Sequence, residues 1–170
     1  VKWRIERDGL MIDEELGRLV GEKLSVEFEE RDIALGHDYL ATTSEFAKRG
    51  VFQSSMCALA VAELYTRELQ IRASIALGQV KRVAGVLRVE LDSQLCAGVK
   101  EFLSETIQTQ SSILTELVLQ RPPLKSDNWA GLNVSGEFAT VLNRTHRNIE
   151  AEVDLWVASH ERQSEAKAAG

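Results

Sequence analysis

Histidine and carboxylate side chains at helical spacing are the residues of this sequence best suited to chemistry. His146 and Glu150 are four residues apart, and Glu30 and His37 are seven residues apart. Each pair shares one face if its segment is helical. Imidazole and carboxylate groups bind transition metals and transfer protons. These four residues are therefore the candidate metal-binding or acid–base residues of the chain.

Other features of the sequence do not add up to a specific catalytic or metal centre. The Glu-x-x-His spacing of di-iron carboxylate bundles is absent. A glycine-rich phosphate loop and a nucleophile motif are absent as well. The sequence therefore favours a non-enzymatic protein without a cofactor. A metal-binding or enzymatic bundle that uses His146, Glu150, Glu30 and His37 stays open as the alternative.

The two cysteines, Cys57 and Cys96, both fall within apolar helical patterns. Such cysteines usually behave as small buried hydrophobic residues. We expect two free thiols, although a disulfide between two helices stays possible on sequence grounds.

Charge and hydropathy bear on the kind of partner. The chain of 170 residues has a net charge of −6 and no cluster of Lys and Arg, which disfavours nucleic acids and anionic membranes. No apolar run is long enough to span a bilayer, and the first residues lack the apolar core of a signal peptide. We expect a soluble, cytoplasmic protein that binds neither nucleic acid nor membrane.

Hydrophobic periodicity predicts an all-α fold, an antiparallel four-helix bundle in one domain covering residues 1–170. The expected helices cover residues 13–48, 51–84, 92–120 and 137–161. Residues 1–12 alternate apolar and polar side chains around Asp8-Gly9, which predicts either a short β-hairpin or an irregular arm anchored by Trp3. Residues 162–170 are polar and alanine-rich, and we expect them to fray.

The stretch from Val51 to Arg121 contains no proline and could form one helix about 105 Å long. Such a helix would need a partner chain to cover it. Lys81-Arg82 before Gly85 are typical of a helix end, and Asp92-Ser93 can cap a new helix. These signals favour two helices with a short connection near residues 85–92.

The first expected helix has two candidate apolar stripes. One stripe includes Lys23, Glu30 and His37, which repeat every seven residues. If this stripe is buried, the three polar residues would fix register or partner choice. If the neighbouring stripe through Phe28 and Leu35 is the buried one, they lie at the rim.

Two pairs in the second expected helix have an acid four residues before a base, namely Glu63 with Arg67 and Glu68 with Arg72. Pairs of this kind stabilise exposed helix faces, so we expect both pairs to be exposed.

The loop after Pro122-Pro123 contains Trp129-Ala-Gly131. This segment resembles the Trp-x-Gly turn of the small helical-hairpin substrates of type VII secretion, in which the Trp packs in the hairpin groove and the Gly makes the turn. The resemblance covers three residues, and the loop here is longer than that family's turn. It implies a secreted hairpin substrate as a second alternative.

Together these features predict a non-enzymatic helical module for protein–protein interaction, with self-association the expected case. Trp3 and Trp129 are its candidate interaction residues.

Overall fold

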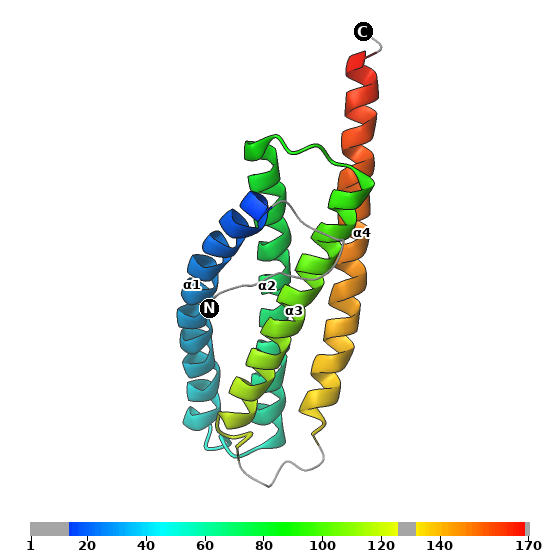
Figure 1. Cartoon of the computed structure of the whole chain (residues 1–170). Helices are drawn as coiled ribbons and strands as arrows, with labels where there is room; N and C mark the ends of the chain where they lie inside the picture. Colours follow the sequence, from blue (N-terminus) through cyan, green and yellow to red (C-terminus); the bar gives the residue numbers. More distant parts are fainter. Residues whose placement is uncertain (1–13, 126–131, 169–170) are drawn as a thin grey trace.

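The computed structural model describes residues 14–125 and 132–168, which fold into four helices and contain no strand. The helices run up and down beside one another, as in an antiparallel four-helix bundle (Figure 1). They are α1 (Glu14–Lys48), α2 (Ser55–Leu87), α3 (Ser93–Gln120) and α4 (Val134–Ala168). The predicted all-α bundle is confirmed. The predicted arm or hairpin over residues 1–12 lies outside the described residues.

The helices pack in an order that leaves α1 at one edge of the bundle. α1 packs against α2, α3 packs against α2 and α4, and α4 also contacts α2 (Figure 1). All four helices contribute to the core, with Leu16, Tyr65, Leu103 and Phe138 among the buried side chains.

The buried face of α1 is the stripe through Leu24, Leu35 and Tyr39. Phe28 of the same stripe packs against the core while partly buried. Lys23, which belongs to the other stripe, is exposed. The interpretation in which the stripe through Phe28 and Leu35 is buried is therefore confirmed. The polar residues at seven-residue spacing do not fill the core.

The turn between α1 and α2 begins where the sequence predicts it. Gly50 has a φ of 69°, the left-handed conformation that glycine adopts at low cost. α2, however, starts at Ser55 rather than residue 51. The Ser54 side chain accepts a hydrogen bond from the Cys57 backbone N–H at 3.2 Å and caps the helix. The residues between Gly50 and Ser54 complete the turn.

The predicted break between α2 and α3 is confirmed, but its first residue is different. Gly85 lies inside α2, and the helix ends at Leu87 before Arg88, which has a φ of 52°. The Arg88 N–H bonds to the Gly85 carbonyl oxygen at 3.3 Å and completes the last turn. Asp92 caps α3, because its carboxylate accepts a hydrogen bond from the Leu95 N–H at 2.7 Å.

α3 ends at Gln120, just before Pro122-Pro123, as predicted. α4 begins at Val134 rather than residue 137, and the Asn133 side chain accepts a hydrogen bond from the Gly136 N–H at 2.9 Å. α4 continues to Ala168, beyond its predicted end at residue 161, while the fraying of residues 162–170 stays a prediction. Residues 161–168 are mostly good helix formers, which accounts for the extra turns. These turns extend past the other helices (Figure 1).

Candidate functional site

The most unusual chemical feature of the core is an ion pair between Glu68 and Arg72 on α2. Their side chains are only 1% and 2% exposed, and Arg72 Nε donates to Glu68 Oε1 at 2.9 Å. The prediction that this pair is exposed is wrong. Spacing of four residues aligns two side chains on a helix, but it does not show which way that face points.

Arg31 of α1 also donates hydrogen bonds to Glu68. Its Nε donates to Glu68 Oε1 at 3.1 Å, and its Nη2 donates to Glu68 Oε2. Both carboxylate oxygens therefore accept hydrogen bonds from arginine. The hydrogen bond to Glu68 raises the pKa of Arg31, with burial opposing the shift.

The remaining donors of Arg72 reach two other helices. Nη1 donates to Gln110 Oε1 of α3 at 2.7 Å, and Nη2 donates to Asp32 Oδ1 of α1 at 2.5 Å. The guanidinium also lies 5.5 Å from the centre of the Phe28 ring, a favourable cation–π distance. Arg72 thus connects α1, α2 and α3.

The four charged groups of this network are two arginines and two carboxylates, so their formal charges cancel. Every nitrogen of Arg72 and both oxygens of Glu68 have a partner. A general acid or base needs a proton that substrate can reach, and this network offers none. We infer that it positions α1 on α2 and α3, because an alternative packing would leave buried charges unpaired.

The structure separates the predicted metal candidates into two pairs on different helices. Glu30 and His37 are exposed on α1, while His146 is partly buried and Glu150 is exposed on α4. Within residues 14–125 and 132–168, no three His, Cys, Asp or Glu residues come together as a possible metal site. His146 Nε2 is buried without a hydrogen-bond partner. Among the described residues, no set of three metal-binding side chains surrounds it.

Both cysteines are free thiols, as expected, and they differ in exposure. Cys57 is buried and Cys96 is partly buried. Burial raises the pKa of both thiols. Cys96 Sγ lies 3.9 Å from Asp154 Oδ1, whose carboxylate also pairs with Lys100 Nζ at 2.6 Å. A raised pKa leaves little reactive thiolate at neutral pH, so neither thiol is suited to nucleophilic catalysis.

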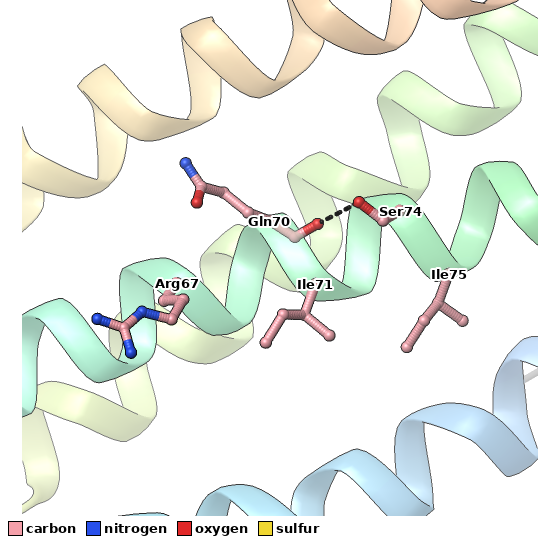
Figure 2. A pocket seen from close by; sticks show the side chains of 5 residues that line it. All are labelled: Arg67, Gln70, Ile71, Ser74 and Ile75. Atoms are coloured by element: carbon pink, nitrogen blue, oxygen red, sulfur yellow. Dashed lines mark hydrogen bonds between the residues drawn. The ribbon is translucent and has the colours of Figure 1, made fainter.

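A shallow hollow of about 420 Å³ lies on the surface of α2 (Figure 2). It is lined by Arg67, Gln70, Ile71, Ser74 and Ile75. The ribbons of α1 and α4 pass on either side of this part of α2 (Figure 2). The lining has no histidine, cysteine or carboxylate, so it offers no acid–base or metal chemistry.

The face of α1 opposite the core has three exposed apolar side chains, which we call the outer stripe. Val26, Ile33 and Leu40 are 57%, 64% and 61% exposed. They repeat every seven residues, which keeps them on one side of the helix at steps of about 10 Å. Their periodicity is visible in the sequence, but the same periodicity is typical of a buried face.

The outer stripe is flanked by Glu29 and Gly36 on one side and by Glu30 and His37 on the other, as helical spacing dictates. Glu29, Glu30 and His37 are exposed.

The predicted interaction residues Trp3 and Trp129 lie outside the described residues, as does the Trp-x-Gly turn. Their interaction role and the resemblance to the hairpin substrates stay predictions.

Comparison with known proteins found no matching family model, curated protein or solved structure. None of the described helices combines the length and the apolar character needed to cross a membrane.

Proposed function

We propose that this protein is a non-enzymatic helical module for protein–protein interaction, and that it self-associates. The observation that carries the proposal is the outer stripe on α1. Three large apolar residues at seven-residue spacing, each more than half exposed, form the kind of ridge that packs into another helix. Single exposed apolar residues are ordinary, but an aligned row is typical of an interface.

The placement of the outer stripe supports the same conclusion. α1 is the edge helix of the bundle, and its buried face is already satisfied by α2. A second helix can therefore approach the outer stripe without disturbing the core. The ionic network keeps α1 in one position relative to α2 and α3, so the ridge is rigid before binding, which lowers the cost of association.

The chemistry of the interior favours an interaction role over an enzymatic one. The hydrogen-bonding groups of Glu68 and Arg72 are satisfied by each other and by neighbouring side chains. The four metal candidates lie in separate pairs on α1 and α4.

Size-exclusion chromatography with light scattering at several loading concentrations tests the proposal. We expect the mass to rise with concentration. Ile33→Ser should lower the association, whereas Met56→Ser on α2, where the side chain is 67% exposed, should not. A strict monomer at every concentration would contradict self-association. Metal analysis of the purified protein addresses the enzymatic alternative, since stoichiometric bound metal would count against our proposal.

A further inference from the structure

Resting on the proposed function, we infer that the partner of the outer stripe is a second copy of this chain, and that the two α1 helices pair antiparallel about a two-fold axis at Ile33. Val26 and Leu40 lie seven residues before and after Ile33. An antiparallel pair centred on Ile33 therefore places Ile33 against its own copy and Val26 against Leu40 of the second copy. Two-fold interfaces need this kind of self-complementary patch.

The next positions of the row at this register lie beyond the two ends of the outer stripe. Leu19 and Ala47 lie fourteen residues to either side of Ile33, so each falls opposite the other in the second copy. Leu19 is partly buried and Ala47 is exposed. Leu19 also packs against the core of its own chain, so the apolar contact between the two copies rests on the outer stripe.

The charges beside the outer stripe favour the antiparallel direction. In an antiparallel pair the same flank of each helix meets, so Glu30 lies opposite His37 of the second copy and Glu29 lies opposite Gly36. In a parallel pair opposite flanks meet, and Glu29 would face Glu30, which is unfavourable. A parallel pair would gain a contact between Glu22 and Lys23, but Glu22 already pairs with Arg18 at 2.7 Å.

Gly36 has no explanation in the packing of the single chain. It lies within α1, and a Cβ atom there would meet nothing within 4 Å. Glycine inside a helix costs about 1 kcal/mol relative to alanine, so the position is unfavourable for an isolated chain. A small residue beside the outer stripe allows the backbone of a second helix to approach closely.

The size of the contact predicts a weak dimer. The outer stripe runs from Val26 to Leu40, fourteen residue steps along one helix or about 21 Å. Such a contact falls below the roughly 1,200 Å² of standard stable interfaces. We therefore expect a concentration-dependent equilibrium rather than a permanent dimer.

Cysteine cross-linking in the full chain distinguishes the two directions. In a Cys96→Ser background, with Cys57 retained in the core, a mixture of Val26→Cys and Leu40→Cys chains should form a covalent heterodimer with a short bismaleimide. Val26→Cys alone should not, because an antiparallel pair separates its two cysteines by about 21 Å along the helix. Ile33→Cys alone should cross-link efficiently, and Leu155→Cys on α4 serves as an exposed control.

Each result has a separate meaning. Cross-linking of Val26→Cys to itself would overturn the antiparallel pairing, as would a dimer in which Ile33→Cys does not react. In both cases self-association would stand. A wild-type chain that is monomeric at every concentration would contradict the inference and the self-association of the proposed function together.

A charge exchange provides a second test that does not depend on cross-linking. Glu30→Lys should weaken the dimer about threefold, because it removes the acid opposite His37 of the second copy. Adding His37→Glu to the same chain should restore association at least to the wild-type level, because it places an acid opposite the new lysine of the second copy. Failure of the second substitution to restore association would overturn the proposed register.

Discussion

At the scale of single residues, Glu68 determines how the interior accommodates charge. A carboxylate that is 1% exposed is stable only when its charge is compensated and its oxygens accept hydrogen bonds. Arg31 and Arg72 provide both. The arginines in turn depend on Glu68, so removal of one member leaves the others with fewer partners.

Glu68→Gln should destabilise the protein by about 3 kcal/mol, because it leaves Arg72 buried with less compensation. Chemical denaturation followed by circular dichroism measures the change. Glu63→Gln on the exposed face of the same helix is the matched control and should change stability by less than about 0.5 kcal/mol. Equal effects of the two substitutions would show that the network does not hold the helices together.

Tyr39 should make the stability of the folded protein depend on pH in the alkaline range. Its hydroxyl donates to the Pro122 carbonyl oxygen at 2.6 Å. Burial raises the pKa of Tyr39, and the nearby Arg121 partly opposes this shift. Because the folded pKa exceeds the unfolded value of about 10, the contribution is complete below pH 10 and is lost as the pH rises through the folded pKa.

Tyr39→Phe should therefore be less stable at neutral pH by about 1 kcal/mol, but its stability should fall less steeply above pH 10. Thermal melts of both proteins from pH 8 to 11 provide the comparison. Tyr65 is present in both, so the difference in slope reports on Tyr39. Parallel pH profiles would contradict this role.

At the scale of elements, two glycines near helix ends have opposite roles. Gly50 adopts a positive φ and terminates α1, whereas Gly85 is an ordinary helical residue of α2. An added Cβ would meet nothing within 4 Å at either position. Backbone conformation alone therefore separates them.

Gly50→Ala should destabilise the protein by about 1 kcal/mol, because alanine is strained in the left-handed region. Gly85→Ala should stabilise it by about 0.5–1 kcal/mol through helix propensity. Denaturation midpoints of the two variants are compared directly. Destabilisation by Gly85→Ala would indicate that α2 ends at Gly85.

These glycines also show which helix ends can be predicted from the sequence. The periodicity of apolar residues predicts four helices, and Gly50, Asp92 and Pro122 mark ends by local chemistry that the structure confirms. Gly85 misleads because a glycine after basic residues has the same local signal whether or not the chain turns there. The turn at Arg88 depends on where α3 must pack, which no local pattern encodes.

The outer stripe and the ionic network were beyond prediction for a related reason. Val26, Ile33 and Leu40 have the spacing of a core face, and Glu68 with Arg72 have the spacing of a surface pair. In the structure the first set is exposed and the second set is buried. Periodicity identifies which residues share a face, but only packing among α1, α2 and α3 decides which face is buried.

At the scale of the whole molecule, the arrangement of helices leaves α1 accessible. α2 contacts all three other helices, while α1 lies at an edge with its outer stripe uncovered. A rigid edge helix with an apolar ridge is suited to pairing with a second helix, and the symmetry of the ridge about Ile33 suits a second copy.

Sedimentation equilibrium measures whether α1 pairs with a second copy in this way. We expect the average mass of the wild-type chain to rise from 18.9 kDa toward twice that value with concentration. Ile33→Asp should stay monomeric, because a carboxylate at the centre of the contact must be desolvated opposite its own copy. Met56→Asp, which adds the same charge to an exposed position of α2, should follow the wild type. A monomeric wild-type chain, or equal association of both variants, would contradict pairing through the outer stripe.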